Sequence, residues 1–216
     1  HGLFSSKDAY KINRMADNIV NAGYTLLTFD FSFVGDSQGD ISKLSILQEV
    51  EDLRSAVNFF KSYCNQSLHI IGSSMGGVVS LIYLSGNSAE VDSLTLIATP
   101  VKLKELLFTD LDLDNVDILP DEGMTLLDGI PVHNKFFKEI KHIDMDEALL
   151  KITIPTLIIH GALDDVVDIS NVQRMEEKLN PQFHSVIIED GDHNLTRDSD
   201  IILLEENILT WLDDHS

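Results

Sequence analysis

Two hydrophobic patterns alternate along the chain. Short apolar runs predict strands buried on both faces, and they fall at residues 24–31, 68–73, 91–99, 154–161 and 183–189. Stretches with apolar residues three and four positions apart predict helices, and they fall at about 7–22, 46–60, 75–85, 170–179 and 200–211. This alternation predicts an α/β fold, with a mostly parallel sheet between two layers of helices, in a single domain over residues 1–216.

Several predicted helices carry end signals. Gly23 follows the first helix, of about 16 residues, where a C-terminal stop is expected. Ser45 and Gln48 form a capping-box pattern at the start of the second. Ser170 and Gln173 form the same pattern near the fourth, so we expect Ser170 to cap it.

Residues 101–152 interrupt the alternation. A short helix is predicted at Leu103–Leu107, an acidic segment follows at 110–122, and Asp128-Gly129 predicts the turn of a hairpin. Long insertions after the carboxyl end of a strand commonly cover a binding site. We therefore expect residues 101–152 to form a cap over the domain.

Composition narrows the range of partners. The formal net charge is −21, with 36 acidic against 15 basic residues, so neither nucleic-acid binding nor stable membrane association is expected.

The single Cys64 excludes an internal disulfide and favours a reducing compartment, which predicts a cytoplasmic location. The chain opens at His1-Gly2, which suggests an N-terminally truncated sequence and would hide an upstream targeting signal. Nothing here predicts an oligomeric state.

The turn between the predicted strand at 68–73 and the helix after it carries the clearest chemical signal. Gly72-Ser73-Ser74-Met75-Gly76 fits G-x-S-x-G with Ser74 at its centre. Glycines at the flanking positions let strand and helix approach, and the central serine then projects above the helix N-terminus as a nucleophile. The alternative is a glycine-rich turn without chemistry. A phosphate-binding loop is disfavoured because no Lys follows the glycines.

A serine nucleophile needs a base and an acid, and in sheets of this kind the chain order is Ser, acid, His. Asp164 follows the strand at 154–161, and His193 follows the strand at 183–189. Both lie at carboxyl ends of strands, where such chemistry gathers. Asp165 and Asp168 compete with Asp164 for the acid role.

Further site residues are predicted around this set. Leu3 N–H and Met75 N–H are the expected oxyanion donors. Phe4, Phe33 and His133 are expected to contact substrate. His160 beside Gly161 is expected to shape the strand end. No cofactor or metal is expected, because no His/Cys/Asp cluster has metal-ligand spacing.

Five motifs together resemble the α/β-hydrolase superfamily, in its branch of carboxylesterases, cinnamoyl/feruloyl esterases, monoacylglycerol lipases and serine-aminopeptidase-like proteins. They are "HGLFSSKD", "FDFSFVGDSQGD", "GSSMGG", "LIIHGALDDVVD" and "EDGDHNL". The family pattern His-Gly-x-x-Asp selects Asp164 as the acid. The family also has strands before the His-Gly loop, and Phe33-Val34 stands where it usually has a glycine.

The resemblance implies a serine hydrolase that cleaves carboxylic esters of small or medium acyl groups through an acyl-enzyme on Ser74. Its partner would be a small-molecule ester. Thioesterase, monoacylglycerol lipase or lysophospholipase, and aminopeptidase-like activities share the same residues and remain alternatives. A hypothesis of another class is a non-catalytic ligand-binding module of this fold.

Overall fold

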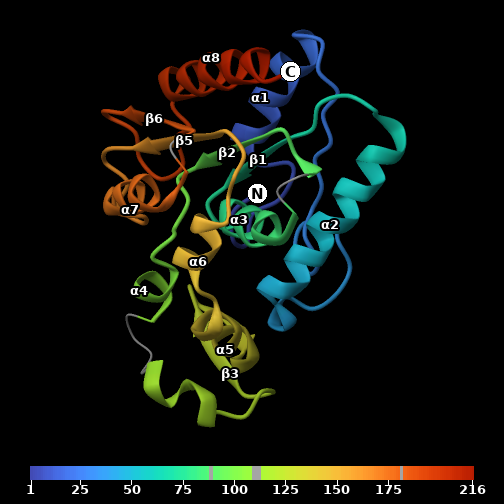
Figure 1. Cartoon of the computed structure of the whole chain (residues 1–216). Helices are drawn as coiled ribbons and strands as arrows, with labels where there is room; N and C mark the ends of the chain where they lie inside the picture. Colours follow the sequence, from blue (N-terminus) through green and yellow to red (C-terminus); the bar gives the residue numbers. More distant parts are fainter. Residues whose placement is uncertain (88–89, 109–112, 181) are drawn as a thin grey trace.

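A computed structural model describes residues 1–87, 90–108, 113–180 and 182–216 (Figure 1). Its main sheet is parallel and runs in the order β1-β2-β5-β6 within this part of the chain. The strands are β1 (His69–Ser73), β2 (Ser93–Ile97), β5 (Thr156–Gly161) and β6 (Phe183–Ile188). Because all of them point the same way, their carboxyl ends share one edge.

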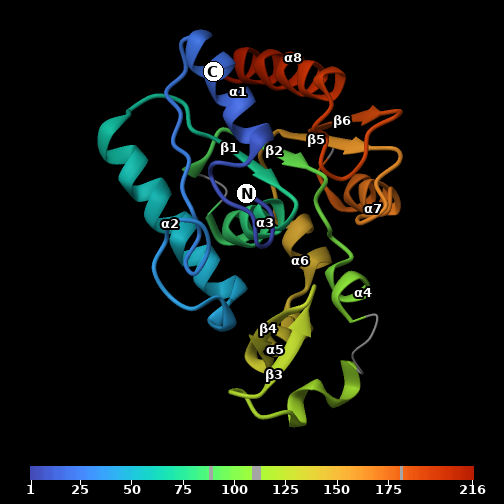
Figure 2. The ribbon, with the colours of Figure 1, turned by 180° about the vertical axis from the view of Figure 1, so that it is seen from behind.

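Helices cover both faces of this sheet (Figures 1 and 2). On one face lie α1 (Tyr10–Asn21) and α8 (Asp198–Asp214), and on the other lie α2 (Ile46–Tyr63), α3 (Met75–Asn87) and α7 (Ser170–Lys178). Successive side chains of β5 alternate between the two cores: Leu157 and Ile159 pack with α1 and α8, and Ile158 packs on the opposite side. This confirms the predicted α/β fold with a parallel sheet covered on both sides.

The helix ends agree with the sequence patterns only in part. Helix α1 is 12 residues long, shorter than predicted, because residues before Tyr10 form turns. It ends as predicted, with Gly23 at φ 99°. At α2, Ser45 Oγ accepts from Gln48 N at 3.2 Å, but the Gln48 side chain donates to Asp52 instead of completing the box.

The predicted cap of α7 is wrong. Ser170 is the first residue of the helix rather than its cap. Its N–H donates to Asp168 Oδ1 at 2.9 Å. A carboxylate is a stronger acceptor for the free N–H groups of a helix start than a hydroxyl, which explains why Asp168 takes this role.

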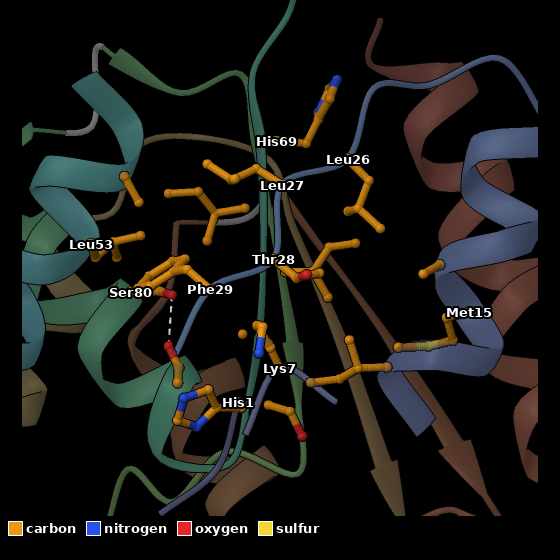
Figure 3. Close-up of a pocket in the computed structure, with 18 of the residues that line it drawn as sticks. His1, Lys7, Met15, Leu26, Leu27, Thr28, Phe29, Leu53, His69 and Ser80 are labelled. Carbon is orange, nitrogen blue, oxygen red and sulfur yellow. Dashed lines mark hydrogen bonds between the residues drawn. The ribbon is translucent and has the colours of Figure 1, made fainter. Parts of the chain in front are cut away.

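The strand predicted at residues 24–31 is not formed. Within the described residues, the N–H groups of Leu26, Leu27 and Thr28 make no backbone hydrogen bond. An apolar cavity of about 200 Å³ separates this segment from β1, so the two backbones do not reach the ~4.8 Å spacing of a ladder. We call this cavity the sheet-edge slot; Figure 3 shows Met15 of α1 and Leu53 of α2 among the residues lining it.

The segment between β2 and β5 extends away from the sheet (Figures 1 and 2). It holds α4 (Leu103–Leu107), the 3₁₀ helix η3 (Leu113–Ile118), β3 (Met124–Leu127), β4 (Ile130–His133), α5 (Asn134–His142) and α6 (Met145–Leu150). Another 3₁₀ helix, η1 (Ile41–Lys43), precedes α2. The short helix and the hairpin form as predicted, and the turn has φ 50° at Asp128 and 80° at Gly129. Part of the predicted acidic segment, residues 110–112, lies outside the described residues.

This segment is packed onto the main core. Phe136, Phe137 and Ile140 of α5 are buried in the same hydrophobic cluster as the side chains of α3. Among the helices described, none combines the length and the apolar character needed to cross a bilayer.

Candidate active site

Ser74 lies at the sharp turn between β1 and α3, with φ 52°. The flanking glycines make this turn possible: a Cβ on Gly72 would come 2.6 Å from Gly76 O, and one on Gly76 would come 2.8 Å from His1 O. The Ser74 N–H donates to Ile97 O at 2.8 Å, which anchors the turn to β2. The local sequence thus holds a serine in a backbone conformation that residues other than glycine rarely adopt.

Asp164 lies in the loop after β5, and its side chain is completely buried. Its Oδ1 accepts from Val166 N at 2.9 Å and from Val167 N at 2.7 Å, and its Oδ2 lies 2.8 Å from His193 Nδ1. Burial by itself would raise the pKa of this carboxyl, but the hydrogen bonds from His193, Val167 and Val166 outweigh burial and lower the pKa. The carboxylate form is therefore the one that faces His193.

The competing aspartates have other environments. Asp165 is exposed, and Asp168 accepts from the N–H of Ser170 at the start of α7. Within the described residues, the His193 ring bonds to Asp164 and to neither of these two.

His193 lies in the loop after β6. Gly161 and Gly191 allow this loop to pack closely against the loop after β5, which carries Asp164. A Cβ on Gly161 would overlap the carbonyl oxygen of Gly191, and Leu163 N donates to Gly191 O at 2.8 Å. Asp192 Oδ1 accepts from Leu195 N at 2.8 Å within the same loop. The close approach of the two loops brings an acid and a histidine that lie far apart in sequence within hydrogen-bond distance.

The first residues of the chain lie against the serine turn. A Cβ on Gly2 would be 3.3 Å from Ser74 Cβ. Leu3 and Met75 line the same cavity as Ser74, and within the described residues their backbone N–H groups donate no hydrogen bond. Two unused N–H donors beside a serine are what an oxyanion-binding site requires.

Asp30 fixes this N-terminal loop, and the sequence analysis did not identify it. Its Oδ1 accepts from Lys7 N at 2.6 Å, and its Oδ2 accepts from Asp36 N at 2.9 Å and from Lys7 Nζ at 3.1 Å. Burial would raise the pKa of Asp30, but the hydrogen bonds from Lys7 and Asp36 lower it overall. The buried carboxylate joins the loop at residues 1–7 to the loop at 32–40. The available signal was its place as the one charged residue inside the apolar run at 24–31, just before a glycine-containing loop.

A cavity of about 800 Å³ connects these groups. Ser74 and His193 both line it. Its apolar wall comes largely from the segment between β2 and β5, namely Leu106, Leu107, Leu126, Leu127 and Phe137. The half-buried Lys11 of α1 also lines it, and burial lowers the pKa of this amine to about 8.

Three residues predicted to contact substrate do not line this cavity. Phe4, at φ 55°, packs against the main core. Phe33, at φ 77°, lies next to Gly39, where a Cβ would overlap its ring. His133 Nδ1 lies 3.4 Å from a carboxylate oxygen of Glu122.

The arrangement suits nucleophilic chemistry. A carboxylate hydrogen-bonded to a histidine, next to a cavity that also exposes a serine hydroxyl and two free N–H donors, can activate the hydroxyl and stabilise an oxyanion. Among the described residues, no group of three His, Cys, Asp or Glu side chains is placed to hold a metal ion.

Known proteins resemble this chain in sequence and in structure. A family model described as alpha/beta hydrolase fold matches residues 1–126. The palmitoyl-protein thioesterase ABHD10, mitochondrial, of Mus musculus is 21% identical over 211 residues, covering 94% of this chain and 70% of the relative. The human protein of that name is 23% identical over 226 residues, covering 98% and 71%.

Solved structures share the fold. Est1E from Butyrivibrio proteoclasticus with ferulic acid bound superposes with a TM-score of 0.87 at 19% identity, covering 100% of this chain and 86% of that one. The monoacylglycerol lipase of Paleococcus ferrophilus gives 0.85 at 16% identity, with coverage of 100% and 93%.

Proposed function

The chain belongs to the alpha/beta hydrolase fold family, and from that premise we propose that it is a serine hydrolase cleaving carboxylic esters of small or medium acyl groups. One observation carries the proposal. His193 Nδ1 lies 2.8 Å from Asp164 Oδ2, and the same imidazole lines a cavity together with Ser74. We assign Ser74 as nucleophile, His193 as general base and Asp164 as the orienting acid.

The proposed reaction has two stages. Ser74 Oγ attacks the ester carbonyl while His193 Nε2 takes the hydroxyl proton, and the oxyanion accepts from the N–H groups of Leu3 and Met75. The C–O bond to the alcohol then breaks, and His193 returns its proton to the leaving oxygen. Water then attacks the acyl carbonyl while His193 takes one of its protons; the bond between the acyl carbon and Ser74 Oγ breaks, His193 returns the proton to Ser74 Oγ, and the acid leaves. Asp164 holds Nδ1–H throughout and stabilises the imidazolium.

We propose residues 101–152 as the cap that selects the substrate. Leucines of α4 and of the hairpin, with Phe137 of α5, supply the apolar wall of the cavity. An apolar wall favours an uncharged acyl chain over a polar one. This supports an acyl ester rather than a peptide as substrate, and the partner is then a small molecule.

A thioester is the second candidate, and the comparisons favour it specifically. Relatives covering 94% and 98% of this chain are named palmitoyl-protein thioesterase. The chemistry would use the same residues, with a thiolate replacing the alcohol as leaving group. A panel of p-nitrophenyl esters of increasing chain length, acyl-CoA thioesters and aminoacyl anilides separates ester, thioester and peptidase activity by relative kcat/KM.

The decisive experiment tests Ser74 directly. A fluorophosphonate probe should form a single adduct on Ser74, identified by peptide mass spectrometry. Ser74→Ala should abolish the adduct and lower turnover of short aryl esters about 10⁴-fold or more, while leaving the thermal unfolding midpoint nearly unchanged.

The opposite result is equally informative. A properly folded protein that binds an ester saturably, forms no adduct and hydrolyses nothing is a ligand-binding module of this fold. Turnover that persists in Ser74→Ala places the nucleophile elsewhere.

The cellular location that we propose rests on cysteine content. The single Cys64 supports a reducing compartment such as the cytoplasm.

A further inference from the structure

His160 occupies an unusual position next to the proposed acid. It belongs to the carboxyl end of β5, and its side chain is fully buried. It does not line the cavity that Ser74 and His193 share. A fully buried imidazole needs a hydrogen-bonding reason to be there.

The ring nitrogens show what that reason is. Nε2 lies 2.7 Å from Val167 O and 3.4 Å from Asp164 Oδ2. A carbonyl oxygen only accepts, so Nε2 must carry the proton. Nδ1 is buried and has no partner within the described residues, and burial lowers the pKa of this imidazole. His160 is therefore neutral, with its proton on Nε2.

We propose that His160 is a positioning residue, whose Nε2–H holds the acid loop at residues 161–167 so that Asp164 Oδ2 faces His193. The proposal rests on the serine-hydrolase function proposed above. It assigns His160 no contact with substrate.

The hydrogen bonds around Val167 form a closed arrangement that explains this role. Val167 accepts from His160 through its carbonyl and donates to Asp164 Oδ1 through its N–H. The two groups belong to successive peptide units joined at the Val167 Cα, so holding the carbonyl restricts the backbone at Val167 and keeps its N–H directed at Asp164 Oδ1. The other carboxylate oxygen is then left to accept from His193. Without the His160 bond, the backbone at Val167 is less restrained, and the carboxylate keeps only the hydrogen bond from Val166 N–H as a firm anchor of Oδ1.

The neutral state of His160 leaves the negative charge of Asp164 available to His193. Among the described residues, the charged or titratable groups close enough to influence the pKa of its ring include Asp164, His193 and Asp168. A second cation here would compete for the single negative charge of Asp164 that stabilises the His193 imidazolium. A neutral N–H donor orients the carboxylate without taking that charge.

The first test uses the unaltered protein. Long-range ¹H–¹⁵N spectra of histidine-labelled enzyme at ~pH 8 should show the His160 ring as the neutral Nε2–H form. A ring that carries its proton on Nδ1, or protons on both nitrogens, overturns the proposal.

The second test compares two amides of different reach. In His160→Gln, the side-chain amide nitrogen replaces Nε2 and can still donate to Val167 O, whereas in His160→Asn the shorter amide cannot reach it. We expect kcat of His160→Gln to stay within about threefold of the original protein. We expect kcat of His160→Asn to fall ~10- to 100-fold with little change in KM. Each rate is divided by the concentration of Ser74 that reacts with fluorophosphonate, so that unfolded molecules do not lower the measured kcat.

The pH profile separates positioning from a merely structural role. In His160→Asn the acidic limb of kcat/KM should move to lower pH, because a less well oriented carboxylate stabilises the His193 imidazolium less. The limb should stay in place in His160→Gln. Equal kcat and superimposable profiles for both variants and the original protein overturn the proposal.

The two proposals fail in different ways. Original protein that does not react with fluorophosphonate contradicts the serine-hydrolase function, whatever the His160 variants do. If neither variant folds, the tautomer measured in the original protein decides the positioning role alone.

Discussion

At the scale of single residues, the bond between His193 and Asp164 is the contact with the largest expected effect on rate. Asp164→Asn keeps the shape of the side chain but removes the negative charge facing Nδ1–H. We expect kcat for an aryl ester to fall about 10³- to 10⁴-fold, because the histidine loses its orientation and its imidazolium loses its counter-charge. Steady-state kinetics on purified variants measures this.

The neighbouring Asp165 provides a matched control. It is exposed, and the His193 ring does not bond to it, so Asp165→Asn should leave kcat within about twofold. Loss of activity in Asp165→Asn with retention in Asp164→Asn would mean that the acid has been assigned to the wrong residue.

Glu49 gives a prediction about stability and pH. It is buried in the first turn of α2, with one carboxylate oxygen unpartnered within the described residues, and burial raises its pKa to about 8. The folded state therefore binds a proton more tightly than the unfolded state, whose pKa is the ordinary 4.5. The stability of the protein should fall as pH rises from ~4.5 to ~8 through this group.

Glu49→Gln removes this dependence, because an amide resembles the protonated acid. At pH 8 it should be more stable than the original protein by about 1–3 kcal/mol, and at pH 4.5 the two should be equal. Urea denaturation at both pH values measures the difference. The exposed Glu51→Gln should show no such pH-dependent gain, and equal behaviour of the two variants would contradict the buried, protonated state of Glu49.

Local sequence patterns predicted Ser74 and His193, which both line the cavity. They did not predict residues whose position depends on contacts with distant parts of the chain. Ser74 stands out because the glycines around it are needed within one turn. Asp30 acts through Lys7 and Asp36, which lie on two different loops, and no spacing reveals such partners. Phe33 was predicted as a substrate contact from its loop alone, but its φ of 77° sends the ring toward Gly39.

At the scale of elements, the crossing of β1 and α3 depends on a missing side chain. A Cβ on Gly72 would come 2.6 Å from the backbone oxygen of Gly76, which cannot move without displacing the helix. Gly72→Ala should therefore destabilise the protein by about 2–4 kcal/mol and reduce labelling of Ser74. Thermal unfolding and fluorophosphonate labelling measure the two effects.

Gly86 is the control in the same helix. A Cβ there would have no atom within 4 Å. Gly86→Ala should stabilise the protein by about 0.5–1 kcal/mol, because alanine favours the helix. Similar losses in both variants would show that the crossing is not the critical contact.

Most elements could be predicted because their signals are local. The Asp128-Gly129 pair predicts its own turn, and both residues adopt the positive φ that such a turn needs. Residues 24–31 show the limit of this approach. Their apolar run predicts a strand buried on both faces, but Thr25, Leu27 and Thr28 are exposed. A strand also needs a neighbour at ladder distance, and the sheet-edge slot lies where that neighbour would be.

At the scale of the whole molecule, the segment beside the sheet-edge slot and the centre of the sheet should differ in how well their backbone N–H groups are protected from hydrogen exchange. Within the described residues, the N–H groups of Leu26, Leu27 and Thr28 lack backbone partners, whereas β2 and β5 are hydrogen-bonded to each other inside the sheet. Hydrogen exchange should be at least ~10³-fold faster at residues 26–28 than in β2 and β5. Comparable protection in the two regions would mean that the segment is paired in solution.

The burial of Phe136 and Phe137 in the same cluster as α3 has a consequence for how this molecule can diversify. Helix α5 lines the cavity through Phe137 and packs in the same hydrophobic core as α3, the helix that follows the Ser74 turn. Large changes to α5 would therefore disturb both the cavity wall and the Ser74 turn. The tip of the hairpin is different: Leu126 is 68% exposed, yet it borders the cavity. Under the proposed function, exchanging a few side chains at that tip should change the substrate preference, while the sheet, Ser74 and His193 stay in place.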